Sequence, residues 1–404
     1  MEKLWITYGN IVDEALVSYF LAPKSYTTEN MCEINSHGGM AVMNQILELC
    51  LKNGAMMAEP GEFTKRAFLN GRIDLSQAEA VVDILNAKTE KESKVAVQQL
   101  EGNLSEKIKQ IRQEIISLLA DIEVTIDYPE YDVEDVTESK ISHVLEKIDI
   151  LLDQLEKSFL NGKILKEGVK VAIVGKPNVG KSSLLNLILN EERAIVTDIE
   201  GTTRDSIEEL IQIDGIPLKI IDTAGIRKAE DTVEKIGVEK SLKILEESDV
   251  VLAIFDVSKE LEKEDRDILK FVEQKNAIIL LNKIDLEKQL SLTEIRNCGK
   301  KIIEISIKNK KGVEELYEAI SAQFKLNEIA IDGELIVTNN RHKSLIMRSE
   351  EYLKKAQEIV EKKLPIDIIS SYLKEIVDEL GKITGESVTE DVINEIFAKF
   401  CLGK

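Results

Sequence analysis

The sequence contains little that could form a metal-bound, disulfide-bonded or membrane-embedded protein. Its four cysteines, Cys32, Cys50, Cys298 and Cys401, make no Cys-x-x-Cys pair, which argues against zinc-finger and disulfide frameworks. No apolar run reaches the roughly 20 residues that a membrane-spanning helix needs. Residues 1–8 lack the charged and then apolar pattern of a signal peptide. We therefore expect a protein of the reducing cytoplasm with no membrane partner.

Positive charge and aromatic residues are also scarce. The 53 Lys and Arg face 74 Asp and Glu, which gives a net charge of −21, and aromatic residues make up 4% of the 404 positions. Broad non-specific binding to nucleic acid needs a cationic surface, so this charge argues against it. A nucleic-acid substrate would be held by a small part of the chain or largely by a partner. The length and the 43% hydrophobic content indicate a folded protein of two or three domains.

Residues 1–70 have the pattern of a small α+β domain. Leu4–Tyr8 and Ala15–Leu21 are predicted strands, and Asn10-Ile11-Val12-Asp13 is expected between them as a separate segment. A helix is predicted at Met40–Lys52, after the turn His37-Gly38-Gly39.

Residues 71–163 are helical in pattern. Apolar residues recur at steps of three and four, as on the buried face of a helix. One face holds Leu104, Ile108, Ile111, Ile115, Leu118 and Ile122, and a second holds Ile141, Val144, Leu145, Ile148, Leu152 and Leu155. An acidic loop is expected between the two helices, and Asn161–Gly168 is predicted to be a linker.

Residues 164–330 alternate between strand and helix patterns, which predicts a mostly parallel sheet with helices on both faces. The predicted elements are strands at Val169–Val174, Leu218–Ile221, Val250–Phe255, Ala277–Leu281 and Lys301–Ile305, with a helix at Lys181–Asn190. Residues 331–404 are helical again, with helices predicted at Arg341–Lys362, Ile366–Leu380 and Thr389–Phe400. The simplest architecture is a helical bundle into which the α/β domain is inserted.

A phosphate-binding loop lies between the first strand and the first helix of the α/β domain. It reads Gly175-Lys176-Pro177-Asn178-Val179-Gly180-Lys181-Ser182-Ser183. Backbone N–H groups and a helix N-terminus form an anion cradle in such a loop. Lys181 is expected at the β- and γ-phosphates, and Ser182 at Mg²⁺. Taken alone, the loop would also fit an ATPase.

Asn282-Lys283-Ile284-Asp285 predicts that the base is guanine. Asp285 can accept hydrogen bonds from the ring N–H and the exocyclic amine of guanine, and adenine lacks both donors. Sites of this kind reject an analogue by roughly 10⁴–10⁵. Ser306-Ile307-Lys308 either completes the base pocket or is a plain loop.

Two further segments have the pattern of nucleotide switches. In Asp222-Thr223-Ala224-Gly225, the Gly225 N–H can sense the γ-phosphate and Asp222 can hold Mg²⁺ through water. In Gly201-Thr202-Thr203-Arg204-Asp205, one threonine hydroxyl is expected to complete the Mg²⁺ shell.

The glutamine that orients the attacking water in Ras-type GTPases is missing, because Ile226 follows Gly225. An arginine finger is typically worth about 10³–10⁵ in rate, and Arg204 and Arg227 are candidates for that role or plain surface residues. A monovalent cation at Asn178 is an alternative. A carboxylate such as Glu234 could hold the water, although a helix-surface acid is the simpler interpretation of this residue.

The four nucleotide-binding motifs above form what we call the nucleotide cassette. Three blocks outside this cassette carry a family resemblance: Cys32-Glu33-Ile34-Asn35-Ser36-His37-Gly38-Gly39, the segment Pro60–Ala80, and Phe400-Cys401-Leu402-Gly403-Lys404. With the cassette, the chain closely resembles the tRNA-modification GTPase family MnmE (TrmE) along essentially its whole length. The resemblance implies a folate-binding, dimerising domain at 1–70, a helical domain in two parts at 71–163 and 331–404, and a GTPase domain at 164–330. Family members begin several tens of residues earlier, so we expect the opening strands of the folate domain to be absent from this chain.

The resemblance also implies the activity. It implies a K⁺-dependent GTPase whose G domains dimerise and which works with a flavoprotein partner, MnmG (GidA). The pair would place an aminomethyl or carboxymethylaminomethyl group on C5 of wobble uridine in tRNA, using a tetrahydrofolate one-carbon unit such as that of 5-formyltetrahydrofolate. The alternative is a regulatory GTPase for ribosome or RNA assembly, which fits the cassette but does not explain the blocks outside it.

Roles for particular residues follow from the same resemblance. It implies K⁺ ligation by Asn178, helped by Thr197, Ile199 and Thr202, and Mg²⁺ ligation by Ser182 and Thr203. Glu234 falls on the water-positioning glutamate, and with Lys181 and Asn178 it makes the expected catalytic set. Glu33, Arg72 and Lys404 fall on folate-contacting positions, and Cys401 is either a catalytic thiol or a small buried residue. The expected GTP-binding residues are Asn178, Val179, Gly180, Lys181, Ser182, Ser183, Thr197, Thr203, Asp222, Gly225, Asn282, Lys283, Asp285, Ser306 and Lys308.

Overall fold

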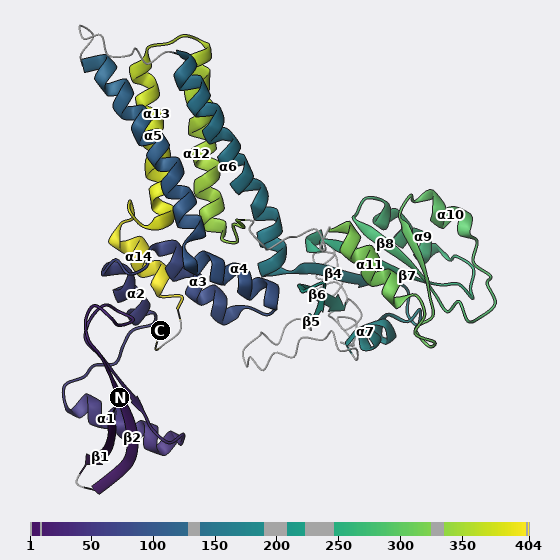
Figure 1. Cartoon of the computed structure of the whole chain (residues 1–404). Helices are drawn as coiled ribbons and strands as arrows, with labels where there is room; N and C mark the ends of the chain where they lie inside the picture. The colour runs from purple at the N-terminus through teal and green to yellow at the C-terminus, as the bar shows by residue number, and fades with distance from the viewer. Residues whose placement is uncertain are drawn as a thin grey trace, which may run out of the picture. The chain divides into compact units, whose positions relative to one another are not determined.

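The computed structural model describes residues 2–8, 10–127, 138–189, 208–222, 246–324, 335–400 and 403. The chain forms two compact units (Figure 1). The first comprises Met1–Asn86, Ala96–Glu156 and Asn340–Lys404, and the second comprises Ala87–Val95 and Lys157–Asn339.

The first unit begins with a three-stranded antiparallel sheet followed by a helix. The strands β1 (Glu2–Tyr8), β2 (Asn10–Phe20) and β3 (Met31–Asn35) pair in that order, and α1 spans Met40–Lys52. The predicted first strand and the predicted helix are confirmed. The prediction of a separate segment at residues 10–13 is wrong, because Asn10, Ile11 and Asp13 pair with β1 and lie inside β2.

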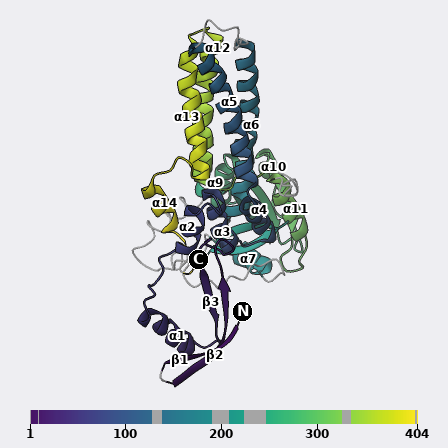
Figure 2. The ribbon, with the colours of Figure 1, turned by 60° about the vertical axis from the view of Figure 1, so that its left-hand side comes forward.

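Helices form the rest of the first unit. They are α2 (Glu62–Leu69), α3 (Leu75–Asn86), α4 (Glu90–Glu101), α5 (Asn103–Asp127), α6 (Glu138–Glu167), α12 (Asn340–Glu361), α13 (Ile366–Thr384) and α14 (Glu390–Phe397), of which α4 and α6 extend into the second unit. In Figures 1 and 2, α5, α6, α12 and α13 run side by side. The apolar face predicted for α5 is buried along its whole length, with every member at most 2% exposed. Hydrophobic periodicity therefore predicted the buried face of α5 correctly.

The linker predicted at Asn161–Gly168 is wrong, because α6 continues without a break to Glu167. Gly162 lies inside the helix, where an added Cβ would be 2.0 Å from the carbonyl oxygen of Val337. This glycine permits a close backbone approach and does not mark a turn. Gly168, at φ +77°, is the residue that follows the helix end.

The second unit contains a six-stranded sheet in the order β5-β6-β4-β7-β8-β9. Its strands are β4 (Val169–Val174), β5 (Glu208–Ile213), β6 (Ile216–Asp222), β7 (Val250–Asp256), β8 (Ala277–Asn282) and β9 (Lys301–Ile305). All neighbouring pairs are parallel except β5 and β6, which form an antiparallel hairpin. The prediction of a mostly parallel sheet is confirmed, and β5 is an element that the sequence analysis missed.

Helices cover both faces of this sheet, as predicted. They are α7 (Lys181–Leu189), α9 (Lys263–Glu273), α10 (Leu292–Asn297) and α11 (Val313–Gln323). Alternate residues of β7 enter opposite cores: Leu252 packs in the cluster that includes residues of α7 and α11, and Phe255 in the cluster with α9 and α10. Among the described residues, no helix is long and apolar enough to cross a membrane.

Candidate nucleotide-binding site

The phosphate loop connects the end of β4, a central strand, to the start of α7. Two of its glycines leave no room for a side chain. A Cβ on Gly175 would lie 2.6 Å from the carbonyl oxygen of Ile254, and a Cβ on Gly180 would lie 2.4 Å from Nδ2 of Asn282. Between them, Asn178 has a left-handed backbone with φ +65°, a conformation that asparagine tolerates better than most residues. The loop is therefore held close to β7 and β8, at the N-terminus of a helix, where anions bind.

The side chains at the start of α7 fit a phosphate and Mg²⁺ site. The ammonium group of Lys181 donates to the carbonyl oxygens of Gly175 and Lys176, each at 2.7 Å. Ser182 and Ser183 are exposed in the first turn of the helix, so their hydroxyls are accessible to a ligand. The described residues contain no group of three or more His, Cys, Asp or Glu that could hold a metal ion.

We call Asn282-Lys283-Ile284-Asp285 the guanine segment. Its first residue, Asn282, lies at the end of β8 and joins this segment to the phosphate loop. Its Nδ2 donates to the carbonyl oxygen of Val179 at 2.8 Å, and its Oδ1 accepts from the backbone N–H of Ile307 at 3.3 Å. The next residue, Lys283, has φ +69°, and its ammonium group lies 2.5 Å from Oδ2 of Asp256. One side chain thus fixes the loop after β8 against both the phosphate loop and the loop after β9.

Asp285, the residue expected to contact guanine, is held by Ser306. The Ser306 hydroxyl donates to Oδ1 of Asp285 at 2.6 Å, and this hydrogen bond, with the nearby charges of Lys308 and Lys283, lowers the pKa of the carboxyl group. Ser306 is fully buried and pairs through its backbone with Lys311, whereas Lys308 is exposed. The carboxylate is therefore ionised at neutral pH, as an acceptor for two guanine donors must be.

The switch residues are less fully described. Asp222 is the last residue of β6 and is in register with Ile173 of β4, which places its backbone at the strand ends beside the phosphate loop. The expected roles of Thr197, Ile199, Thr202, Thr203, Gly225 and Glu234 fall on residues outside the described part of the chain. The same holds for the alternatives Arg204 and Arg227, and for Cys401 and Lys404 at the end of the chain.

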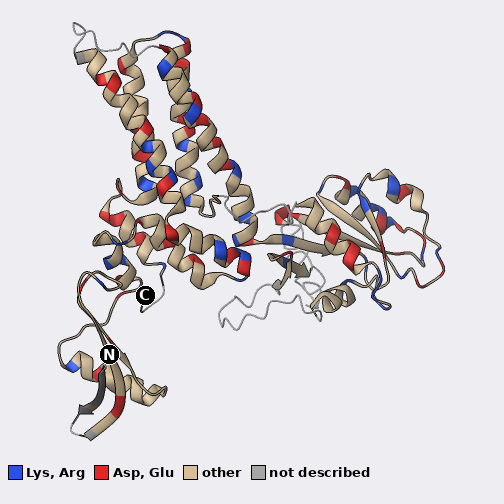
Figure 3. Ribbon diagram, viewed as in Figure 1, with Lys and Arg blue, Asp and Glu red and all other residues tan. Residues whose placement is uncertain are grey.

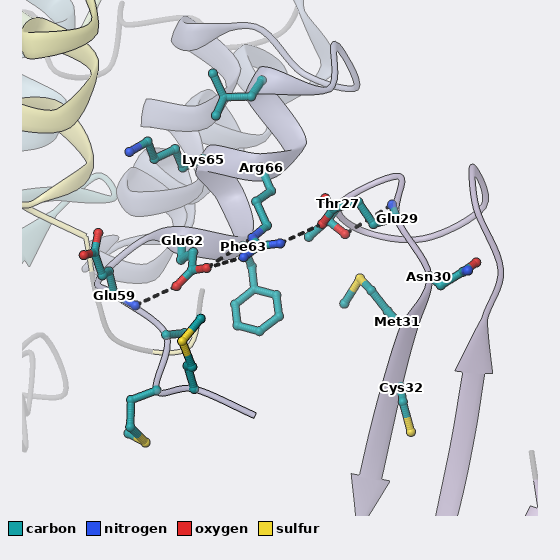
Figure 4. A pocket seen from close by; sticks show the side chains of 14 residues that line it. Thr27, Glu29, Asn30, Met31, Cys32, Glu59, Glu62, Phe63, Lys65 and Arg66 are labelled. Carbon is teal, nitrogen blue, oxygen red and sulfur yellow. Dashed lines mark hydrogen bonds and ion pairs between the residues drawn. The ribbon is translucent and has the colours of Figure 1, made fainter. Parts of the chain in front are cut away.

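The expected folate residues lie in the first unit. Glu33 is exposed on β3. Arg72 donates to the carbonyl oxygen of Tyr26 at 2.9 Å and stacks over the Tyr26 ring at 4.6 Å. A pocket of about 800 Å³ lies nearby, lined by Met31, Cys32, Phe63 and Arg66 among others (Figure 4), and neither Glu33 nor Arg72 lines it. Arg66 pairs there with Glu29 and Glu62.

Sequence reasoning missed three charged residues that support the site. Asp256 ends β7 and accepts hydrogen bonds from Lys283 and from the backbone N–H and hydroxyl of Ser258. Lys176, inside the phosphate loop, pairs with Asp265 of α9. The sequence holds one weak signal for Asp256: it is an acidic residue directly after an apolar strand. Parallel strands end at one edge of the sheet, where ligand-binding sites form. The partner of Lys176 depends on a contact between segments distant in sequence.

Comparisons with known proteins agree along the whole chain. Residues 2–72 match the family model described as GTP-binding protein TrmE N-terminus, and residues 75–401 match the MnmE helical domain. The tRNA modification GTPase MnmE of Acetivibrio thermocellus is 52% identical over 398 residues, which cover 98% of this chain and 87% of the relative. The protein of the same name from Thermoanaerobacter pseudethanolicus is 49% identical over 407 residues, with 98% and 88% covered.

Among solved structures, the G domain of the T. maritima FeoB iron transporter is 27% identical, covers 38% of this chain and 98% of that chain, and has a TM-score of 0.30.

Proposed function

The chain belongs to the MnmE family of tRNA modification GTPases, enzymes that hydrolyse GTP, and we propose that its hydrolysis depends on K⁺ and on the pairing of two G domains. The observation that carries the GTPase site itself is the joined geometry of the two nucleotide segments. Asn282 is bonded to the phosphate loop, and Asp285 is fixed by Ser306. This geometry supports GTP recognition by the two segments, while Ile226 leaves the orientation of the attacking water to other groups.

We assign the cation sites to residues around the phosphate loop. Ser182, whose hydroxyl is exposed at the helix start, would hold Mg²⁺ together with Thr203. Asn178 would hold K⁺ through its side-chain oxygen, with Thr197, Ile199 and Thr202. The cations supply positive charge to the phosphate oxygens when bound. Lys181 binds the phosphates, and Glu234 holds the attacking water.

The same proposal extends to tRNA. Two copies of the chain pair, and with the flavoprotein MnmG they modify C5 of wobble uridine in the cytoplasm. Along the bundle helices Lys and Arg are interspersed with Asp and Glu (Figure 3), and the net charge is −21. The partner therefore supplies much of the surface that binds the tRNA backbone.

Folate binding is assigned in this proposal to residues near both ends of the chain. Glu33, Arg72 and Lys404 contact a tetrahydrofolate such as 5-formyltetrahydrofolate, and the domain limits are 1–70, 71–163, 164–330 and 331–404. Arg72 is already oriented by Tyr26, which supports a fixed guanidinium at this position. Cys401 remains a candidate for covalent chemistry on the uridine ring.

The cation proposal is tested by GTP hydrolysis of the full chain in equal concentrations of KCl and NaCl. We expect hydrolysis to be much faster in KCl, with fluorescent GDP binding equally well in both salts as the control. In the same assay, Glu234→Ala should lower turnover by about 10²-fold or more, because it removes the group that positions water, and should leave GDP binding intact. Equal rates in the two salts would refute the K⁺ site, and unchanged turnover would exclude Glu234.

The tRNA proposal is tested by nucleoside analysis of tRNA from a strain that lacks the gene. We expect the modified wobble uridine to disappear and to return with the intact gene. Modification that persists without the gene would favour the role in RNA assembly. Calorimetric titration with 5-formyltetrahydrofolate tests the folate site separately, with Arg72→Ala as the variant that should bind weakly.

A further inference from the structure

Lys176, the second residue of the phosphate loop, carries none of the ligand-binding or catalytic roles proposed above. Its ammonium group lies 2.7 Å from Oδ2 of Asp265 and 3.0 Å from Oε2 of Glu262. The side chain of Lys176 is 13% exposed and that of Asp265 is 6% exposed. The pair with Asp265 is therefore largely removed from water, in contrast to the exposed ion pairs of this unit, which contribute little.

The two carboxylates are themselves fixed at the start of α9. The backbone N–H of Glu262 donates to Oδ2 of Asp265 at 2.9 Å, as one half of a reciprocal capping box at the helix N-terminus. Asp265 thus has a defined orientation independently of Lys176. An acceptor held in this way loses little freedom when it binds an ammonium group.

The main chain of Lys176 is held as well, because its carbonyl oxygen accepts a hydrogen bond from Lys181 at 2.7 Å. Burial would lower the pKa of the Lys176 ammonium group, but the hydrogen bonds to Asp265 and Glu262 outweigh burial and raise it. The Lys176 ammonium group thus stays charged throughout the neutral range. The first half of the loop is anchored to α9, while the second half is anchored to β8 through Val179 and Asn282.

We propose that Lys176 is a positioning residue for nucleotide binding: its ion pair with Asp265 and Glu262 holds the first half of the phosphate loop in the shape that receives the phosphates. Helix α9, which has no residue in the nucleotide cassette, is then part of the support of the site. A preformed loop lowers the ordering cost of ligand binding, so the ion pair acts on affinity for GDP and GTP alike and little on the chemical step.

The test compares Lys176→Ala, Lys176→Arg and Asp265→Asn with the unaltered full chain. We expect Lys176→Ala to raise the Kd for a fluorescent GDP and the KM for GTP by about tenfold, as the loss of a charged hydrogen bond implies, with kcat changed less than about twofold. Lys176→Arg should restore most of the affinity, since a guanidinium can pair with the same carboxylates. The matched control is Lys288→Ala, which breaks the exposed 2.8 Å pair with Glu304 in the same unit and should leave Kd unchanged.

A double-mutant cycle makes the result specific. Asp265→Asn removes the charge but keeps a side-chain oxygen that can accept the capping hydrogen bond, and thermal melting checks that each variant is folded. If the pair is responsible, Lys176→Ala should cost little further affinity in the Asp265→Asn background. An unchanged Kd in Lys176→Ala, additive effects in the cycle, or equal losses in Lys176→Ala and Lys176→Arg would each overturn the proposal.

Discussion

The side-chain amide of Asn282 donates a 2.8 Å hydrogen bond to the carbonyl oxygen of Val179 and so connects the guanine segment directly to the phosphate loop. Both residues are 3% exposed. A buried carbonyl that loses its donor costs about 1–3 kcal/mol. The bond therefore contributes to the stability of the loop and to the spacing between the phosphate and base sites.

We expect Asn282→Ala to weaken the binding of GDP and GTP by about tenfold or more, because it leaves the Val179 carbonyl without this donor. Fluorescent nucleotide titration measures the effect. The matched control is Asn276→Ala, since Asn276 also donates to a backbone carbonyl, that of Asp249, but at an exposed position. Equal affinities of Asn282→Ala and the unaltered chain would show that the bond does not support the site.

Asp285→Asn is expected to shift base preference from guanine to xanthine. The amide would offer a donor where the carboxylate offers an acceptor, and xanthine carries a carbonyl where guanine carries its exocyclic amine. A site built on such bonds can shift preference by about 10²-fold or more, measured as the ratio of kcat/KM for GTP and XTP. Asp267→Asn, at an exposed position of α9, should keep the preference for GTP. A retained preference in Asp285→Asn would place guanine recognition elsewhere.

Acid should destabilise the first unit through Glu79. Its carboxylate accepts hydrogen bonds of 2.7 Å from both Arg341 and His342. Burial alone would raise the pKa of Glu79, but the charge and hydrogen bond of His342 and the contacts of Arg341 outweigh it and lower the pKa to about 2, from 4.5. Because the pKa is lower in the folded state, the stabilisation is complete above pH 4.5 and is lost as the pH falls toward 2.

The measurement for Glu79 is thermal melting between pH 7 and pH 3. Glu79→Gln should lose about 3 kcal/mol of stability at neutral pH and should melt with a weaker dependence on acid. Glu358→Gln, which breaks an exposed pair with Lys362, is the control and should change the melting temperature little. An acid dependence as steep in Glu79→Gln as in the unaltered chain would exclude Glu79 as its source.

Glu350 should have the opposite pH dependence. It is 9% exposed, and its Oε1 has no hydrogen-bond partner among the described residues. Burial and the nearby carboxylate of Glu156 raise its pKa to about 7, from 4.5. Since the folded state holds this proton more tightly than the unfolded state, stability falls as the pH rises from 4.5 to 7 and stays low above that.

Glu350→Gln removes the ionisation and should stabilise the protein by about 1–2 kcal/mol at pH 8, with little effect near pH 4.5. Glu351→Gln, at the exposed neighbouring position, should not change stability. Thermal melting at the two pH values compares them. A loss of stability at pH 8 in Glu350→Gln would mean that the ionised carboxylate is stabilised in the folded protein.

The elements predicted best were those with strong local patterns. β4, β9 and α1 have the predicted bounds, because an apolar run or a helical period is decided by neighbouring residues. The hairpin strand β5 was missed although a local signal existed. Asp214 and Gly215 both have positive φ, as the two central residues of a type I′ hairpin turn require, and Asp-Gly between strands is typical of that turn.

Two other discrepancies came from contacts between distant segments. The linker predicted at Asn161–Gly168 did not take account of the close packing of Gly162 against Val337. The pair between Lys176 and Asp265 joins the phosphate loop to a helix outside the cassette. Motifs predicted the ligand-binding residues, but the residues that contact and support those motifs have no motif of their own.

The contact between Gly180 and Asn282 restricts which residues can stand at these two positions, which are distant in the sequence. Nδ2 of Asn282 occupies the space in which a Cβ at Gly180 would lie, at 2.4 Å. An alanine at position 180 would therefore require a smaller residue at position 282, and that residue would no longer hold Val179. Gly180 also has φ +113°, so we expect mutational libraries of this chain to keep glycine at position 180 and, because it holds Val179, asparagine at position 282.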